Sequence, residues 1–217
     1  MPDLIETTLA GALGDSTSIG QVLIQGTAGN CFTLCHRDDH PSSKLTNFRR
    51  PDDAIEIGKF DDAGNYRPLK TAPNLRRGWR LDLLDLGELR QALDHFYPGR
   101  LAMLLASNEN RLAATPLRET LNRQSGMYRV AAKISDQQID HLVGDFCRSD
   151  GGCLRTILWR RDANGSIPST KLPSQKFDPA FDQTGRGERA IPLLCQEACN
   201  LLVAECRKAV KDETNKE

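Results

Sequence analysis

Four of the seven cysteines form two close pairs whose spacing could bind a metal cluster. Five residues separate Cys147 from Cys153 and three separate Cys195 from Cys199, with 41 residues between the pairs. Thiolate sulfur is a ligand of both iron–sulfur clusters and zinc, and four thiolates complete either kind of site. The spacing predicts one site made by all four cysteines, which would hold a [4Fe-4S] cluster, a [2Fe-2S] cluster or zinc.

The spacing and the neighbouring charges favour iron–sulfur over zinc. Structural zinc sites usually space their ligands by two to four residues in both pairs, and the first pair here is wider. Arginines at positions 148, 155, 160 and 161 surround that pair and would stabilise anionic sulfur. A third interpretation stays open, in which the cysteines are small apolar residues of the core.

The other three cysteines are predicted to bind nothing. Cys31 and Cys35 are four residues apart in an expected strand, so their side chains would lie roughly 13 Å apart on one face. Cys206 lies outside both pairs and is expected to be a buried or spare thiol. Loss of any of these three should leave the cluster in place.

The elements that position the paired cysteines are predicted from local signals. Ser135 and Gln138 form a capping box, and the apolar stripe that follows predicts a helix ending at Cys147. A strand over 154–160, a turn over 162–165 and a loop to about 189 come next. A last helix over 191–210 would place Cys195 and Cys199 on one face, one turn apart.

The region upstream mixes strands and helices. Alternating apolar residues predict an antiparallel sheet, and periodic leucines predict helices that cover it. The fold class is therefore α+β, with a mixed antiparallel-sheet and helix N-terminal region packed on a small helix-rich C-terminal domain. The expected strands are 21–25, 31–36, 54–60 and 78–84, with a hairpin loop at 26–30, and the expected helices are 86–96, 100–106 and 116–123.

Composition narrows the class of protein. The chain has 217 residues with 29 basic and 29 acidic side chains, so its net charge provides no field to hold nucleic acid or an anionic membrane. No apolar stretch approaches the roughly 20 residues that span a bilayer, and the first residues lack the basic start of a secretory signal. We expect a cytoplasmic protein without nucleic-acid or membrane partners, whose cysteines stay reduced.

Two motifs resemble a known family. Residues 146–159 (FCRSDGGCLRTILW) and 192–202 (PLLCQEACNLL) are similar to the iron–sulfur cluster-binding domain appended to CbiX-type sirohydrochlorin cobaltochelatases. Residues 36–39, 66–79 and 126–129 resemble the companion stabilising domain of those proteins. The resemblance extends from about residue 20 to residue 206.

The resemblance implies a cofactor, its ligands and a domain order. The cofactor is a [4Fe-4S] cluster, and the ligands are Cys147, Cys153, Cys195 and Cys199. The implied domains are a stabilising α+β domain (20–127) and the cluster-binding domain (128–210). Residues 1–19 show no lasting periodicity and are predicted to be a flexible leader with one helical turn at 5–13, and residues 211–217 to be a flexible tail.

The leading hypothesis is electron transfer or redox sensing, and the analogy with those proteins suggests an accessory role in tetrapyrrole or cobalamin metabolism. The partner would be a redox protein or a separate chelatase chain. In the resembling proteins a chelatase catalytic module precedes this region, whereas only some 20 residues do so here. Chelatase activity is therefore not expected, and the chain is not expected to be an enzyme on its own. The alternative is a non-redox interaction protein with a structural cluster or zinc site.

Overall fold

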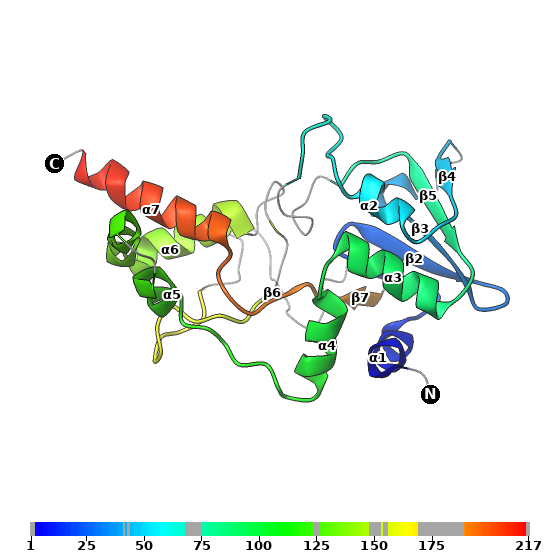
Figure 1. The fold of residues 1–217 in the computed structure, drawn as a ribbon, viewed down its shortest axis with the longest axis horizontal. Coiled ribbons are helices and arrows are strands. Elements are labelled where there is room, and N and C mark those ends of the chain that lie inside the picture. Colours follow the sequence, from blue (N-terminus) through cyan, green and yellow to red (C-terminus); the bar gives the residue numbers. More distant parts are fainter. Residues whose placement is uncertain are drawn as a thin grey trace. The chain divides into compact units, whose positions relative to one another are not determined.

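The chain folds into two compact units. The computed structural model describes residues 3–40, 42, 44–67, 75–123, 126–147, 153, 156–168 and 189–215. The N-terminal unit comprises Met1–Arg111 and Asp178–Leu193, and the C-terminal unit comprises Leu112–Phe177 and Leu194–Glu217 (Figure 1). The boundary between the units therefore lies near residue 111, whereas the boundary predicted from the sequence is at residue 127.

A six-stranded sheet forms the centre of the N-terminal unit, in the order β4-β5-β3-β2-β1-β7. The predicted hairpin is confirmed, because β2 and β3 pair antiparallel from Val22 opposite His36 to Thr27 opposite Cys31. The predicted strand at 78–84 is confirmed as β5, which pairs antiparallel with β3. The strands are β1 Ser16–Ile19, β2 Val22–Thr27, β3 Cys31–His36, β4 Thr46–Phe48, β5 Trp79–Leu83 and β7 Arg189–Ile191.

The sheet is mixed rather than purely antiparallel. β4 pairs with β5 in parallel, and β7 pairs with β1 in parallel, with Ile19 opposite Ile191. Parallel neighbours need long connections, so their pairing leaves no local turn signal in the sequence. The prediction of an antiparallel sheet is wrong for these two strand pairs, and the fold class remains α+β.

Helices cover one face of this sheet and enclose the core of the unit (Figure 1). The predicted helices at 86–96 and 100–106 are confirmed as α3 Leu86–Phe96 and α4 Arg100–Asn108. The ring of Phe96 stacks on Trp79 of β5 with centroids 5.2 Å apart. The buried apolar residues that α3 and the three central strands share are Val22, Ile24, Leu34, Trp79, Leu81, Leu83, Leu89, Ala92, Leu93 and Phe96.

The strand predicted at 54–60 is wrong, because this segment begins with the helix α2 Asp53–Ile57. The carboxylate of Asp53 accepts hydrogen bonds from the backbone N–H groups of Arg49 and Arg50, which fixes the turn that starts the helix. Ala54 and Ile57 are fully buried while Ile55 is exposed. The burial period is thus that of a helix, although the residue types alternate as in a strand.

Residues 1–19 are predicted to be a flexible leader with one helical turn at 5–13; the helical turn is confirmed, whereas the flexible leader is wrong for the strand at 16–19. Helix α1 Leu4–Ala12 begins at Asp3, whose side chain accepts a hydrogen bond from the backbone N–H of Ile5, and Leu9 is fully buried in the core. The next residues form β1, an interior strand of the sheet. Short polar segments such as 16–19 become strands because two neighbours satisfy their backbone groups, which local sequence does not show.

The C-terminal unit is built from short elements around a second core. The predicted helix at 116–123 is confirmed as α5, and the capping box of Ser135 and Gln138 is present at the start of α6. α7 continues to Thr214, so the tail predicted for 211–217 is helical over its first four residues. The elements are α5 Leu117–Arg123, the 3-10 segment Gly126–Lys133, α6 Asp136–Leu142, the π-helical turn Val143–Cys147, β6 Thr156–Ile157, β8 Leu194–Cys195 and α7 Asn200–Thr214.

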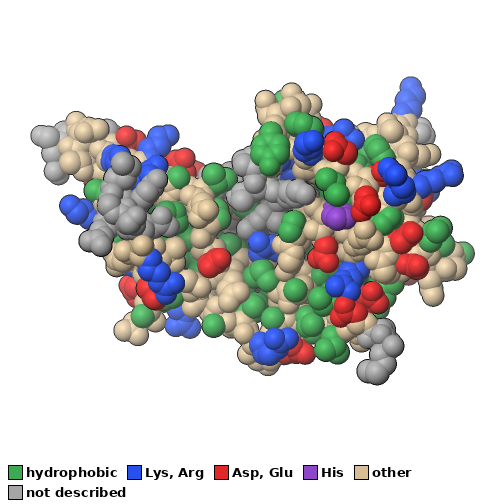
Figure 2. All heavy atoms as spheres, viewed as in Figure 1, with side chains coloured by type: hydrophobic (Ala, Val, Ile, Leu, Met, Phe, Trp, Pro, Cys, Tyr) green, Lys and Arg blue, Asp and Glu red, His purple; other side chains and the backbone are tan. Residues whose placement is uncertain are grey.

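Two further features are the distribution of charged side chains on the surface and the apolar length of the helices. Among the described residues on the face that Figure 2 shows, acidic and basic side chains are interspersed rather than gathered by sign. No helix in the described ranges combines the length and the apolar character that a bilayer span requires.

Gly20, in the turn between β1 and β2, supplies a test of the packing in the N-terminal unit. Its φ is +56°, and a Cβ there would lie 2.6 Å from the Tyr97 hydroxyl and 2.8 Å from Leu193. Backbone strain and overlap together predict that Gly20→Ala destabilises this unit by about 2–4 kcal/mol. Urea unfolding followed by Trp79 fluorescence in a Trp159→Phe background measures the loss.

Gly26→Ala is the matched control, because Gly26 lies in β2 and a Cβ there would have nothing within 4 Å. We expect it to change the midpoint of the same transition by no more than the equivalent of about 0.5 kcal/mol. Equal effects of the two substitutions would contradict the packing described around Gly20.

Candidate metal centre

The second cysteine pair does not lie on one helix, so the predicted helix at 191–210 is wrong over its first nine residues. Cys195 ends strand β8, and Cys199 precedes α7, which begins at Asn200. Ile191 and Leu194 belong to two different strands, β7 and β8. Pro192 separates them, and a residue before proline is biased away from helical dihedrals, which is the one local signal against the predicted helix.

Cys199 is the N-cap of α7, a role that the sequence analysis missed. Its backbone is extended, and its Sγ accepts a hydrogen bond from the backbone N–H of Leu202 at 3.5 Å. The N-terminus of a helix carries a partial positive charge, so this position stabilises negative charge on the sulfur. The same N–H would remain a donor to this sulfur in a bound cluster.

Strands β6 and β8 connect the two halves of the cysteine set. They pair in parallel with Ile157 opposite Cys195, and the backbone N–H of Leu158 donates to the carbonyl of Cys195 at 2.9 Å. Cys153 precedes β6 by three residues. This pairing brings together the segments next to the two cysteine pairs, which 41 residues separate in the sequence.

Cys147 joins the same core from another element of the unit. It ends the π-helical turn Val143–Cys147, which continues α6, and it belongs to the apolar cluster that also contains Cys195. Cys199 packs against that cluster. Cys147, Cys153 and Cys195 are at most 9% exposed, and Cys199 is partly exposed. π-Helical turns occur frequently at functional sites, where they redirect a side chain.

Part of the predicted first motif lies outside the described residues. This holds for the turn 148–152, for Arg148 and for residues 154 and 155 of the predicted strand 154–160. The turn predicted at 162–165 is confirmed, because the backbone N–H of Gly165 donates to the carbonyl of Asp162. In the described residues no three His, Cys, Asp or Glu side chains are arranged around a single metal ion.

The donor set fits an iron–sulfur cluster by its chemistry. The four cysteines belong to one unit and would supply sulfur only, as these clusters prefer. The thiol of Cys195 donates to the carbonyl of Glu197 at 3.2 Å, and this hydrogen bond would be lost when the thiol is deprotonated for ligation. Binding of the cluster would thus release protons.

Of the remaining cysteines, two lie in the N-terminal unit and Cys206 lies in the same core as Cys147 and Cys195. Cys31 and Cys35 are the first and fifth residues of β3 in the N-terminal unit, so extended backbone separates them. Cys206 is fully buried in the core of the C-terminal unit, and burial raises the pKa of its thiol to about 12. A thiol with that pKa stays protonated at neutral pH and is a poor ligand.

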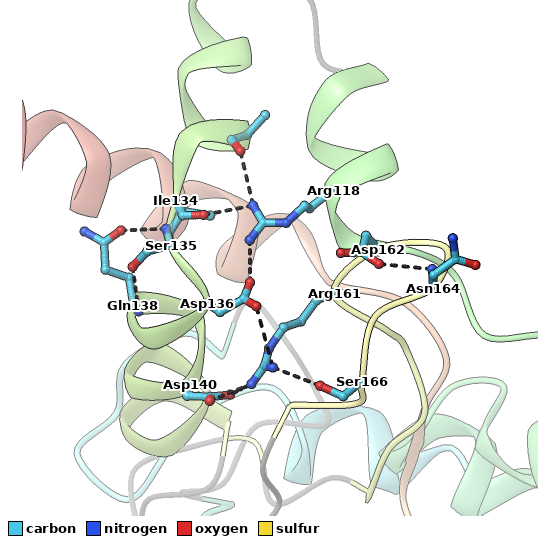
Figure 3. Close-up of polar contacts among 11 residues, drawn as sticks. Arg118, Ile134, Ser135, Asp136, Gln138, Asp140, Arg161, Asp162, Asn164 and Ser166 are labelled. Carbon is cyan, nitrogen blue, oxygen red and sulfur yellow. Dashed lines mark hydrogen bonds and ion pairs between the residues drawn. The ribbon is translucent and has the colours of Figure 1, made fainter.

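A chain of ion pairs holds the elements around this centre (Figure 3). Arg118 of α5 donates to the carbonyl of Ile134 at 2.8 Å and pairs with Asp136 at the start of α6. Arg161 binds both carboxylate oxygens of Asp140 and the hydroxyl of Ser166. These contacts fix α6, which leads to Cys147, against α5 and the segment that follows β6.

The comparisons with known proteins agree with the two units. Residues 8–107 match the DR2241 stabilising domain, and residues 109–208 match the 4Fe-4S iron-sulfur cluster binding domain. The crystal structure of DR2241 from Deinococcus radiodurans superposes with a TM-score of 0.72 and 27% sequence identity over 96% of this chain. That protein is described as a multi-domain protein with structural similarity to chelatases and two additional novel domains.

The chain spans 41% of the length of the DR2241 protein. No curated protein matches the sequence. The two matched domains meet at residue 108, which agrees with the change between the two units near residue 111.

Removal of the Arg161 guanidinium tests the ion-pair chain. Arg161 is 14% exposed and its partners Asp136 and Asp140 are partly exposed, so we expect Arg161→Met to destabilise the C-terminal unit by about 1–3 kcal/mol. The chain has two tryptophans, Trp79 and Trp159. Urea unfolding followed by fluorescence in a Trp79→Phe background therefore reports on Trp159, which is buried in this unit.

Arg123→Met is the control, because Arg123 pairs with Glu119 on the exposed surface of α5. Its loss should cost less than about 0.5 kcal/mol. An Arg161 variant as stable as the Arg123 variant, at matched iron content, would show that the ion-pair chain does not hold these elements.

Proposed function

We propose that this chain, which consists of a DR2241 stabilising domain followed by a 4Fe-4S iron-sulfur cluster binding domain, uses its [4Fe-4S] cluster in electron transfer or redox sensing. The observation that supports this most directly is the pairing of β6 with β8. It puts the strand that follows Cys153 beside the strand that contains Cys195, although the two are far apart in the sequence.

The proposed ligands are the two cysteine pairs. Each ligand comes from a different backbone setting: the end of a π-helical turn, the residue before β6 by three positions, the end of β8 and the N-cap of α7. A cluster with four iron corners would need all four sulfurs to face one point, which these separate elements would have to bring about on binding. The ligands in chain order are Cys147, Cys153, Cys195 and Cys199.

The groups around the ligands would tune the site. A bound cluster supplies a one-electron redox couple whose potential depends on hydrogen bonds to its sulfurs and on solvent exposure. The backbone N–H of Leu202 already donates to Sγ of Cys199 and would favour the more negative, reduced state. The low exposure of Cys147 and Cys195 would oppose added charge. Cys199 is the most exposed of the four, so a partner would approach the cluster from its side.

The proposed partner is a redox protein or a separate chelatase chain. The DR2241 protein has structural similarity to chelatases in the same polypeptide as its additional domains, and this chain matches only part of it. A role as an accessory to tetrapyrrole or cobalamin metabolism follows from that arrangement by analogy. The analogy concerns the pathway and not a reaction of this chain.

Single substitutions test the ligand set. We expect Cys147→Ala, Cys153→Ala, Cys195→Ala and Cys199→Ala each to lose most of the iron after anaerobic purification, because three thiolates leave one iron corner open. Iron and sulfide analysis together with visible absorption measures the loss.

Three further variants are the matched controls. Cys31→Ala, Cys35→Ala and Cys206→Ala should retain the iron content of the unmodified chain, because these residues lie on β3 or have a protonated, buried thiol. Full iron and sulfide in any of the four ligand variants would remove that cysteine from the set. Loss of the cluster in the Cys206 variant alone among the controls, with the fold intact by circular dichroism, would add Cys206 to it.

A further inference from the structure

The connecting segment, residues 109–115, joins α4 of the N-terminal unit to α5 of the C-terminal unit. Residues 111–115 belong to no helix or strand, and Arg111, Ala113 and Ala114 are exposed. An exposed segment without regular structure is usually among the first parts of a fold to open. The last residues of this one, however, are bound by the chain next to the candidate metal centre.

Thr115 is hydrogen-bonded to the chain just beyond both strands of the small sheet. Its backbone N–H donates to the carbonyl of Gln196 at 3.3 Å, and its carbonyl accepts from the backbone N–H of Arg160 at 3.2 Å. Gln196 directly follows Cys195, the last residue of β8, and Arg160 follows the last residue of β6 by three positions. Thr115 thus continues the backbone pairing of β6 with β8.

The side chain of Gln196 holds the connecting segment at a second point. Its Nε2 donates to the carbonyl of Ala113 at 2.7 Å. Gln196 therefore binds the segment twice, once through its side chain at Ala113 and once through its carbonyl at Thr115. Because an amide side chain donates from one end only, this grip depends on where the backbone places Gln196.

The position of Gln196 depends in turn on Cys195. β6 and β8 have two residues each, too few for a pair of strands that is stable alone. A cluster held by Cys195 would link β8 covalently to the other ligand-bearing segments and so fix the residue that follows it. Loss of the cluster would remove this support from Gln196, because metal binding and folding are coupled in such sites.

We propose that the connecting segment reports whether Cys195 holds the cluster. With the cluster bound, Gln196 keeps Ala113 and Thr115 in place. When the cluster is lost, both hydrogen bonds open, and the segment becomes accessible to enzymes that bind extended chain, such as a protease. The inference rests on the proposed function, since it names the change by which a redox-sensing cluster would act on the rest of this chain.

Limited trypsin digestion of the full chain tests the proposal, with the cluster bound and after its removal by a chelator. We expect cleavage after Arg111 to become about tenfold faster without the cluster, because proteolysis follows the population of the open segment. Cleavage after Arg123, on α5 of the same unit, should change by less than about twofold. The side chains of Arg111 and Arg123 are 62% and 68% exposed, so the two sites are matched.

A pair of neighbouring variants tests the role of Gln196. In the cluster-loaded chain, Gln196→Ala removes the hydrogen bond to Ala113 and should speed cleavage after Arg111 by about threefold at unchanged iron content. Glu197→Ala removes the exposed side chain of the next residue and should leave that rate unchanged. Mass spectrometry of the fragments identifies the bond that is cut.

The outcomes separate this inference from the proposed function. The proposal is overturned if cleavage after Arg111 and after Arg123 accelerates alike, because the whole unit then unfolds. It is also overturned if removal of the cluster leaves the rate at Arg111 unchanged, or if the Gln196 and Glu197 variants behave alike. In each of these cases the iron in the purified chain leaves the proposed function standing. A chain that never acquires iron ends the proposed function and this inference together.

Discussion

The pairing of two short strands, β6 and β8, is the interaction on which the candidate metal centre depends. β6 follows the first cysteine pair, and β8 contains Cys195, the first member of the second pair. The backbone pairing of these strands therefore keeps the two cysteine-bearing segments close together. Two residues per strand are too few to be stable in isolation. The core around Trp159 and Leu202 supports the pairing, and a bound cluster would support it further. If ligation and folding are coupled in this way, loss of the cluster loosens the C-terminal unit.

Ion pairs around the candidate centre hold the same elements in place. Arg118 and Arg161 reach from α5 and from the segment after β6 to the acids of α6, and α6 leads through a π-helical turn to Cys147. Their acceptors include backbone carbonyls that no helix satisfies, such as that of Ile134. Side chains thus replace the regular hydrogen bonds that a unit of short elements lacks. This is the arrangement expected where a small core must hold ligands on several separate segments.

The elements that were predicted correctly are those that depend on interactions between residues close together in the sequence. The capping box at Ser135, the hairpin at 26–30 and the leucine stripe of α3 all act within a few residues, and the structure confirms each of them.

Long-range pairing explains the elements that were predicted wrongly. β1 and β7 pair although about 170 residues separate them in the sequence. The apolar residues of 191–199 have helical spacing, but strand pairing of β7 and β8 places part of this segment in sheets instead. The cysteine types and spacing could be recognised from the sequence. The strand position of Cys195 and the capping role of Cys199 could not, because both depend on partners that only the fold supplies.

The central claim is that the chain holds one redox-active cluster on four thiolates. Anaerobic purification of the full chain, followed by iron and sulfide analysis and by visible and EPR spectra before and after dithionite, tests it most directly. The account predicts about four irons and four sulfides per chain, as a cubane on four cysteines requires, and a broad visible band that dithionite bleaches and reoxidation restores. Zinc alone, or metal-free protein with free thiols, would contradict the cluster, and a full cluster that no reductant changes would leave it a structural role only.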